Sequence, residues 1–388
     1  MRIGVVTTGY PHRGDCVAGA FVRAQCLALV ARGHRVDVVC AARPSDVALT
    51  DDGITIHPVR YGTAAMEALF YDVGAPERLA HGMSRAWLGA AAFPFAAARV
   101  ARSALGSCDA LISHFVLPSA WIAGRIADGR THLAIGHGSD VAWLARTPAA
   151  AQRAVLRHAT HIQFTHAAAR NSVDASALER ASVHVRPMGV TTRPMGLAER
   201  RAARSRLGVR GFCVATVARL IPLKGVDGLV DAIALLARDG IEATLLVAGD
   251  GPERSALEAR ARGLGSPARF LGAVDSATRD DVLAACDVFA LASRVLPSGR
   301  TDAAPVALME AMAARRAVVA TRVGGLPDVV ADAGTIVPPD DAPALAHAIG
   351  AFALDPGARD VVAERAGQRA AQWHWDAQAE WLDGILRE

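Results

Sequence analysis

The amino-acid sequence predicts an α/β protein of two Rossmann-like domains, each with a doubly wound parallel sheet. Three observations lead to this fold class. The chain has 388 residues, more than one ordinary domain holds. Short β-branched runs alternate with longer helical runs, and the strand-like runs are apolar throughout, as in sheets covered on both faces. The alternation then restarts after a Gly-, Pro- and Arg-rich stretch at 189–211.

The first domain is expected over residues 1–188. The segment "AFVRAQCLALVARGH" (20–34) has apolar residues at helical spacing and Gly33 as a stop signal, and it lies between two apolar runs. It therefore predicts a strand–helix–strand unit, and the same alternation continues. Strands are expected at "IGVVTT" (3–8), "RVDVVCA" (35–41), "ITIHPV" (54–59), "ALISHF" (110–115), "HLAIGH" (132–137), "HIQFT" (161–165) and "SVHVRP" (182–187).

The second domain is expected over residues 189–370, beginning with a linker and a short helix. The end of the chain, 371–388, is amphipathic and is expected to form a helix that packs across the domain junction. Ligands should lie at the carboxyl ends of the strands, where the two domains face each other across a cleft. Strands are expected at "FCVATVA" (212–218), "ATLLVAGD" (243–250), "ARFLGAV" (268–274), "DVFALAS" (287–293) and "AVVATRV" (317–323).

Cysteine usage and the N-terminus indicate a cytoplasmic protein. The six cysteines form no CxxC pair, which favours buried reduced thiols over a disulfide frame or a zinc site. The opening "MRIGVVTT" leaves no room for a signal peptide. The longest uncharged apolar stretch, 86–98, contains Pro94 and is too short to span a bilayer. A packed, kinked helix is expected there, with an interfacial membrane contact as the alternative.

Charge is distributed unevenly along the chain. Residues 1–188 carry 19 arginines against 13 acidic residues, a net +6, whereas residues 189–388 carry 23 basic against 25 acidic residues, a net −2. The basic first half favours an anionic partner, such as lipid headgroups at the inner face of the membrane, a phosphorylated acceptor or an acidic glycan. Ordinary solvated surface is the alternative. Nucleic acid is disfavoured, because no basic run is interleaved with aromatic residues.

The chain contains one lysine among 42 basic residues, and it lies at position 224 in "VARLIPLKGV" (217–226). Arg219 ends a predicted strand and Lys224 precedes a predicted helix, "VDGLVDAIALLAR" (226–238), whose N-terminus itself favours anions. A planar guanidinium and a compact ammonium suit two neighbouring oxyanion groups in different ways. The pair therefore predicts a diphosphate site, with an ordinary charge at a helix start as the alternative. The segment is neither a P-loop nor a GxGxxG fingerprint.

A second candidate site is "TDAAPVALMEAMAARRAVVAT" (301–321). Asp302 and Glu310 are eight residues apart, and a helix is expected to begin near Pro305 and Val306. A loop carboxylate can then face a sugar, while the helical carboxylate accepts hydrogen bonds from ribose hydroxyls. The backbone N–H groups of 303–306 are further anion donors.

The ordered motifs "VARLIPLKG", "LLVAGDGPER", "RFLGAV", "DVFALAS" and "PVALMEAMA" resemble the C-terminal half of the retaining GT-B glycosyltransferases of family 4. In the N-terminal half, "GAFVRAQCLALVARGHRVDVV" resembles the family's first βαβ unit, and "HLAIGHGSDV" resembles its HGxD segment. The resemblance covers essentially the whole chain. The stretch "SRVLPSGRTDAAPVALMEAMA" is most similar to bacterial enzymes of exopolysaccharide and cell-surface glycan assembly.

The resemblance implies a role for individual residues. Arg219 and Lys224 match the basic pair that binds the donor diphosphate. Asp302 and Glu310 match the two acids of the E-x7-E motif, of which the first lies beside the donor sugar and the second holds the ribose. His137 matches the active-site histidine that touches the donor sugar. Further donor-side positions are Gly19 near the phosphates, Gly249 and Gly251 on the nucleotide side, and the turn formed by Ala303, Ala304, Pro305 and Val306.

Some residues depart from the family pattern or admit a plainer interpretation. Position 302 is Asp where the family has Glu, and Ala303 stands where the family has Gly, which puts the choice of donor sugar or the activity in doubt. His137 is singled out by its place at a strand end beside Gly138 and Asp140; the other histidines are expected to be structural or on the surface. Asp140 could instead simply cap a helix.

The function expected from the resemblance is transfer of a sugar from a nucleoside diphosphate sugar to a hydroxyl acceptor, with retention at the anomeric carbon. UDP-sugars are favoured over GDP-sugars, and the acceptor is a sugar, a lipid-linked or a small molecule. No DxD occurs in the chain, so Arg219, Lys224 and helix dipoles are expected to stabilise the leaving group without metal or cofactor. A GT-B-fold epimerase or phosphorylase and a non-catalytic nucleotide-binding subunit are the alternatives.

Overall fold

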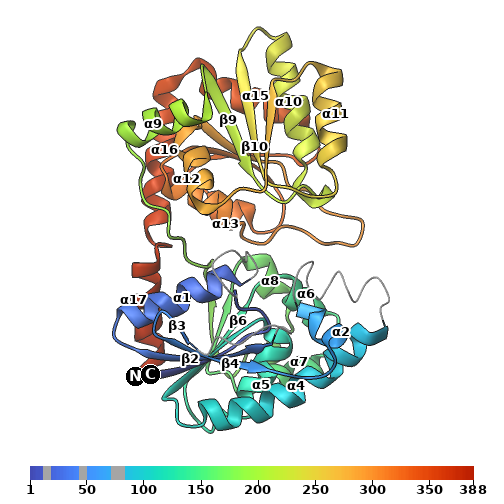
Figure 1. The fold of residues 1–388 in the computed structure, drawn as a ribbon, viewed down its shortest axis with the longest axis vertical. Coiled ribbons are helices and arrows are strands. Elements are labelled where there is room, and N and C mark those ends of the chain that lie inside the picture. The colour runs from blue at the N-terminus through green and yellow to red at the C-terminus, as the bar shows by residue number, and fades with distance from the viewer. Residues whose placement is uncertain (12–18, 43–49, 71–83) are drawn as a thin grey trace. The chain divides into compact units, whose positions relative to one another are not determined.

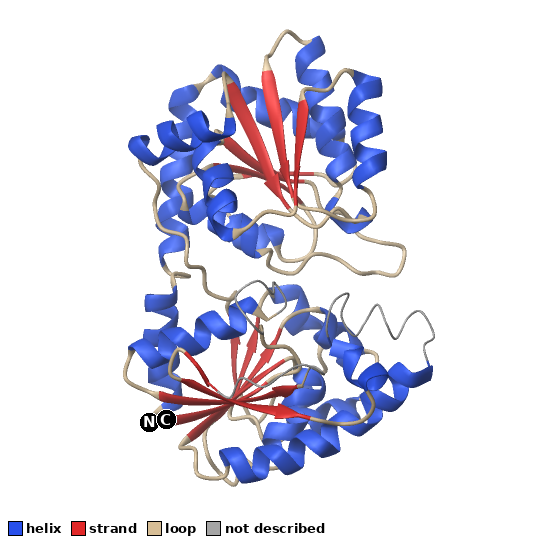
Figure 2. Ribbon diagram, in the orientation of Figure 1, coloured by secondary structure: helices blue, strands red, loops and turns tan. Residues whose placement is uncertain are grey.

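The computed structural model describes residues 1–11, 19–42, 50–70 and 84–388, which form two compact units (Figure 1). The first unit is Met1–Gly189 with Trp375–Glu388, and the second is Val190–His374. Each unit has a central sheet with helices on both faces, which confirms the predicted fold class (Figure 2). Cys16 lies outside the described residues; the other five cysteines are buried free thiols.

The sheet of the first unit has the strand order β3-β4-β2-β1-β5-β6-β7-β8, and within the described residues only β3 runs antiparallel to its neighbour. Successive residues of the central strand β1 face opposite layers: Val5 joins the core under α1 and α17, and Val6 joins the core under α4. The strands are β1 (Arg2–Val6), β2 (Arg35–Ala41), β3 (Thr50–Asp51), β4 (Ile54–Val59), β5 (Ala110–His114), β6 (His132–Gly136), β7 (His161–Phe164) and β8 (Ser182–Val185).

The helices of the first unit bury their apolar faces against this sheet. Helix α4 contributes Phe93, Ala97 and Ala101, all fully buried, and Pro94 lies inside the same helix. None of the described helices is long and apolar enough to cross a bilayer. The helices are α1 (Ala20–Ala31), α2 (Ala64–Glu67), α4 (Ser84–Leu105), α5 (Trp121–Gly124), α6 (Ser139–Ala145), α7 (Ala149–Leu156), α8 (Ala167–Ser172) and α17 (Trp375–Leu386).

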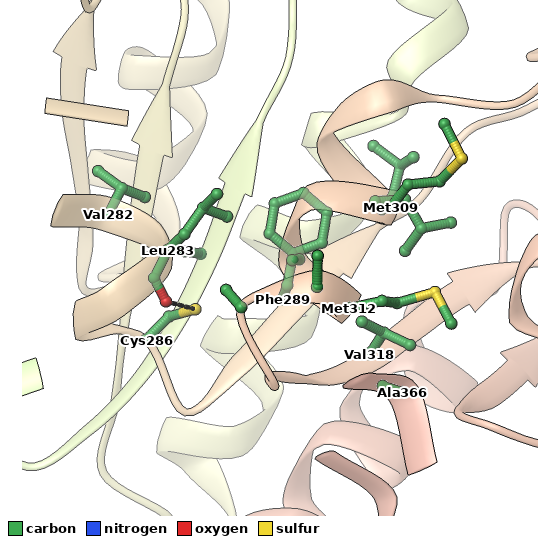
Figure 3. Packing of buried hydrophobic residues seen from close by; sticks show 14 of the residues in the cluster. Val282, Leu283, Cys286, Phe289, Met309, Met312, Val318 and Ala366 are labelled. Atoms are coloured by element: carbon green, nitrogen blue, oxygen red, sulfur yellow. Dashed lines mark hydrogen bonds between the residues drawn. The ribbon is translucent and has the colours of Figure 1, made fainter. Parts of the chain in front are cut away.

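The sheet of the second unit is parallel in the order β11-β10-β9-β12-β13-β14. Figure 3 shows Phe289 of β12 packed among Met309 and Met312 of α13, with Val318 of β13 close by. The strands are β9 (Phe212–Val217), β10 (Ala243–Ala248), β11 (Ala268–Gly272), β12 (Val288–Leu291), β13 (Ala317–Thr321) and β14 (Thr335–Val337). The helices are α9 (Leu197–Leu207), α10 (Val226–Arg238), α11 (Arg254–Leu264), α12 (Ser276–Ala285), α13 (Val306–Ala313), α14 (Leu326–Val330), α15 (Ala342–Leu354) and α16 (Pro356–Ala371).

The structure departs from the predicted elements at three places. The strands β3 and β14 were not predicted, because two and three residues are too few to show a period. The terminal helix, expected as a separate element over 371–388, begins at Trp375. It belongs to the first unit, where Trp375 and Leu382 join the core beside α1.

Candidate functional site

Four neighbouring strands of the second unit end at one edge of the sheet, and the predicted donor residues follow them. The strand order places β10, β9, β12 and β13 side by side and parallel. Arg219 and Lys224 lie in the loop after β9, and Gly249 and Gly251 lie in the loop after β10. Asp302 lies in the segment between β12 and α13. This edge is where open α/β sheets bind their ligands.

A glycine lets the loop after β9 approach the end of β12. Pro222–Lys224 forms a 3₁₀ turn, and Gly225 then begins α10 with φ +59°. A Cβ atom at Gly225 would lie 2.0 Å from the carbonyl oxygen of Ala292, which follows β12. No side chain fits in that space, so the sequence Lys-Gly places the lysine beside the loop after β12.

Lys224 forms an ion pair with Asp302. Its Nζ lies 2.5 Å from Asp302 Oδ2, and Ser293 Oγ donates a hydrogen bond of 2.7 Å to the same oxygen. The side chains of Lys224 and Asp302 are only 17% and 12% exposed, so solvent screens the pair weakly. The structure thus brings two predicted site residues together, as partners of each other.

Arg219 differs from Lys224 in its surroundings. Its side chain is exposed, and its guanidinium forms no hydrogen bond or ion pair with any described residue. The two members of the predicted basic pair therefore differ in their electrostatic partners. The guanidinium of Arg219 is available to an anion, whereas the charge of the Lys224 ammonium is neutralised by Asp302.

The predicted nucleotide-side glycines have a structural explanation. A Cβ atom at Gly249, where φ is +138°, would lie 1.8 Å from Ala218 O, and one at Gly251 would lie 2.3 Å from Leu220 O. Both glycines let the loop after β10 lie against the loop after β9, and Leu220 N donates to Asp250 O at 2.9 Å. Their contact with a nucleotide stays a prediction.

Glu310 lies on α13 and is buried, with 5% of the residue exposed. Arg279 of α12 places its Nη1 3.0 Å from Glu310 Oε1. Burial nevertheless raises the pKa of Glu310 to about 7, because desolvation outweighs the attraction of Arg279, and Asp280 adds to the rise. At neutral pH this carboxyl group is therefore poised between its two protonation states.

The turn before α13 offers fewer backbone donors than predicted. Pro305 is the N-cap of α13 and has no N–H, so the prediction that all of 303–306 donate is wrong at this residue. The N–H groups of Ala303, Ala304 and Val306 donate to no acceptor within the described part of the chain. These three are the groups left to meet an anion.

In the first unit, His137 follows β6 and lies among aromatic rings. Its ring centroid lies 4.8 Å from that of Phe21 on α1 and 4.7 Å from that of Phe115 after β5. Its Nε2 lies 3.1 Å from Nδ1 of the fully buried His114. Desolvation lowers the pKa of His137 to about 3, so the ring is uncharged at neutral pH.

Asp140 does not cap a helix, because the N-cap of α6 is Gly138 and Asp140 lies in the first turn. Its carboxylate accepts the N–H of His137 at 2.9 Å and the N–H of Val116 at 2.7 Å. Burial raises the pKa of Asp140 to about 6. Asp140 therefore joins the loops after β5 and β6 and fixes the backbone that carries His137.

Gly19, the predicted phosphate-side glycine, begins α1 with φ +81°. A Cβ atom at this position would lie 2.7 Å from Gly9 O, so the residue is also required by the close approach of the segment after β1. The residues just before it, 12–18, lie outside the described residues.

The comparisons with known proteins place the chain in a family. A profile of the glycosyl transferases group 1 matches residues 211–355, which contain Arg219, Lys224, Asp302 and Glu310. Over 279 residues the chain is 32% identical to the GDP-mannose-dependent alpha-(1-6)-phosphatidylinositol monomannoside mannosyltransferase of Mycobacterium tuberculosis, covering 68% of this chain and 71% of that protein. The chain belongs to the group 1 glycosyltransferases.

This glycosyltransferase is also similar to other proteins in sequence and in fold. It is 38% identical over 205 residues to the D-inositol 3-phosphate glycosyltransferase of Saccharomonospora viridis, which is 49% of this chain and 46% of that protein. Sucrose-phosphate synthase of Thermosynechococcus elongatus matches 100% of this chain and 98% of its own, with a TM-score of 0.72 and 21% identity. Anabaena HepE in complex with UDP and glucose matches 100% and 99%, with a TM-score of 0.70 and 21% identity. The fold is GT-B.

Sequence reasoning missed several residues of the glycosyltransferase that contact predicted site residues. Ser293 donates a hydrogen bond to Asp302, and Arg279 forms an ion pair with Glu310. A ring nitrogen of His114 lies 3.1 Å from one of His137. Ser293 and His114 each lie at the end of an apolar strand run, which is a usable signal. Arg279 carries none, because one arginine of a helix looks like any other until the fold places it.

Proposed function

We propose that this glycosyltransferase moves a sugar from a nucleoside diphosphate sugar to a hydroxyl acceptor with retention at the anomeric carbon. The observation that carries the proposal is the placement of the only lysine. Lys224 and Arg219 lie at the carboxyl end of a central strand, and Lys224 lies at the start of the thirteen-residue helix α10. The compact ammonium, the guanidinium and the helix N-terminus all favour the two charges of a diphosphate.

Electrostatic stabilisation of the leaving diphosphate is the proposed main contribution of the protein. Charge grows on the leaving oxygen as the bond to the sugar breaks, and preorganised cations at that point lower the barrier. Lys224 reaches this role by leaving Asp302, which then faces the donor sugar. An oxygen of the leaving phosphate takes the proton of the acceptor hydroxyl, so the step needs no enzymic base. His137 fits this scheme, because an uncharged ring contacts the sugar without acting as an acid.

We propose that the transfer is independent of metal ions. The sequence has no DxD, and within the described residues no three His, Cys, Asp or Glu side chains are grouped as ligands would be. Arg219 and Lys224 supply the positive charge instead. Transfer measured in excess EDTA should keep its rate; a loss of activity that Mg²⁺ or Mn²⁺ restores would refute this part of the proposal.

Whether the donor carries guanine or uracil is to be determined by experiment, and we propose GDP-mannose as the first donor to test. A relative of 32% identity is named a GDP-mannose-dependent mannosyltransferase, whereas the sequence analysis favours UDP-sugars. The names of two relatives include phosphatidylinositol monomannoside and D-inositol 3-phosphate. We therefore propose a hydroxyl of an inositol-containing or lipid-linked acceptor.

The test is a thermal-shift screen of GDP-mannose, UDP-glucose, GDP and UDP on the wild type and on Lys224→Ala. A nucleotide should raise the melting temperature of the wild type and raise that of the variant less. Release of nucleoside diphosphate and the anomer of the product, read by NMR, then identify a retaining transferase. Interconversion of nucleotide sugars would indicate an epimerase, and binding with no turnover would indicate a non-catalytic subunit.

We also propose that α4 contacts an anionic membrane at its surface. Leu88 and Phe95 on this helix are 60% and 71% exposed, and exposed Arg99 and Arg102 follow at helical spacing, so apolar and basic side chains share one outward stripe. Trp87, half exposed, lies beside this stripe. Such a face matches the inner leaflet by both hydrophobicity and charge.

Vesicle binding tests this contact. The wild type should sediment with phosphatidylglycerol vesicles more than with phosphatidylcholine vesicles, and Leu88→Ser combined with Phe95→Ser should abolish the difference. The control is Leu354→Ser in α15, which removes a leucine of the second unit that is 75% exposed. Equal sedimentation of all three proteins would refute the contact.

A further inference from the structure

His137 is the end of a chain of three side chains that begins at Gln25 on α1. Gln25 Oε1 lies 2.8 Å from His114 Nε2, and His114 Nδ1 lies 3.1 Å from His137 Nε2. Gln25 and His114 are 2% and 0% exposed. The planes of the two imidazoles differ by only 15°. Gln25 and His114 are both buried, so the polar atoms through which His114 contacts Gln25 and His137 need hydrogen-bond partners, and each link is a hydrogen bond with a defined donor.

The direction of the two hydrogen bonds follows from the amide oxygen. An amide oxygen accepts and never donates, so His114 donates through its Nε2–H to Gln25. A neutral imidazole has one N–H, so the Nδ1 of His114 carries a lone pair and accepts from the Nε2–H of His137. Burial lowers the pKa of His114 well below its usual range and that of His137 to about 3, so neither ring gains a second proton at neutral pH.

We propose that Gln25 and His114 are positioning residues that fix the tautomer of His137, so that its Nδ1 presents a lone pair to the donor sugar. This inference rests on the proposed function, which puts His137 at that sugar. An acceptor nitrogen between the rings of Phe21 and Phe115 selects a sugar group that donates, a hydroxyl or an amine. A carboxylate or keto oxygen at the same position would face a lone pair and find no donor.

The tautomer is measured without any activity. Protein labelled with ¹⁵N at histidine gives two-bond ¹H–¹⁵N spectra in which the protonated ring nitrogen is identified, and His137→Gln shows which signals belong to His137. At pH 7 the expected form is neutral with Nε2–H. Gln25→Met has no acceptor oxygen and should give a mixture of the two neutral forms. An Nδ1–H form of His137 in the wild type would overturn the proposal.

Kinetics separate a positioning role from a structural one. Gln25→Met should lower kcat/KM for the transferred nucleotide sugar roughly three- to tenfold, the value of one neutral hydrogen bond, and leave the Kd of the free nucleoside diphosphate unchanged. The matched control is Gln152→Met, another buried glutamine of the first unit, which donates to Thr147 O and accepts from Asp174 N.

The outcomes distinguish the inference from the function beneath it. Equal losses in Gln25→Met and Gln152→Met, or a weakened Kd for the free nucleotide, would overturn the positioning role. The Nε2–H form in a protein that transfers no sugar would overturn the proposed function, and with it the sugar contact, while confirming the tautomer.

Discussion

Asp302 forms an ion pair with Lys224, the residue that is proposed to bind the donor diphosphate. Asp302→Asn should therefore strengthen nucleotide binding. Asparagine keeps the size of the side chain and an oxygen for Ser293, but it removes the charge 2.5 Å from Lys224 Nζ. In the wild type a diphosphate must draw Lys224 away from a carboxylate and then bind near that carboxylate. In the variant neither cost remains.

The size of the effect follows from the burial of the pair. At an effective dielectric constant of about 20, two unit charges about 3 Å apart attract by about 5 kcal/mol before desolvation is subtracted. Exposed ion pairs retain about 0–1 kcal/mol of this, and removing one partner of a fully buried pair costs about 3–5 kcal/mol. Lys224 and Asp302, at 17% and 12% exposed, lie between these limits. We expect a net effect of about 1–2 kcal/mol, which is roughly 5- to 30-fold in affinity.

Calorimetric titration of GDP and of UDP into the wild type and Asp302→Asn measures this gain. The same variant should lose about 1–2 kcal/mol of unfolding free energy in urea and most of its transfer rate, because the carboxylate proposed to face the sugar is gone. Asp360→Asn, at a side chain that is 77% exposed, removes the same charge elsewhere in the second unit and should change neither quantity. Unchanged or weaker nucleotide binding by Asp302→Asn would refute the reasoning.

Three further outcomes are expected. Lys224→Arg should lower kcat/KM about tenfold or more, because a planar guanidinium does not replace a compact ammonium in a largely buried ion pair. Steady-state kinetics measure this effect and circular dichroism checks that the variant is folded; wild-type kinetics would contradict the prediction. Gly225→Ala should lower the free energy of unfolding in urea by roughly 2–5 kcal/mol, because its Cβ would lie 2.0 Å from a carbonyl oxygen at a φ of +59°. The control is Gly240→Ala, where φ is +78° and nothing lies within 4 Å of the added Cβ; it should lower that free energy by only about 1–2 kcal/mol. Burial raises the pKa of Glu310 from 4.5 to about 7, so the folded protein keeps a proton that the unfolded chain releases. The free energy of unfolding should therefore fall by roughly 3 kcal/mol as the pH rises from 4.5 to 7. If the free energy of unfolding changes with pH equally in the wild type and in Glu310→Gln, the prediction of a buried acid is contradicted.

The sequence predicted elements wherever a local pattern was strong. The helix expected at 226–238 has those bounds in the structure, and α13 begins where Pro305 and Val306 indicate. The same local logic missed the short strands β3 and β14, and it predicted the terminal helix without identifying what that helix packs against. The amphipathic pattern of 371–388 identifies an apolar face but not its partner, and that partner is α1 in the first unit.

The candidate site was predicted residue by residue and not contact by contact. Lys224, Asp302, Glu310 and His137 were all named from motifs and from resemblance, each as a group that meets a ligand. Their partners in the free protein come from distant parts of the chain: 78 residues separate Lys224 from Asp302, and 23 separate His114 from His137. A pairing over such distances leaves no period in a sequence.

By itself, the sequence determined the doubly wound α/β class, because the alternation of apolar strands and helices is a local property, and its ordered motifs carried the resemblance to the family. Only the tertiary structure decided the state of the site residues. Burial makes His137 a neutral ring and keeps Glu310 half protonated, and the close approach at Gly225 puts Lys224 against Asp302. Desolvation and ion pairing depend on which chain segments meet, and that is fixed only when the sheets have formed.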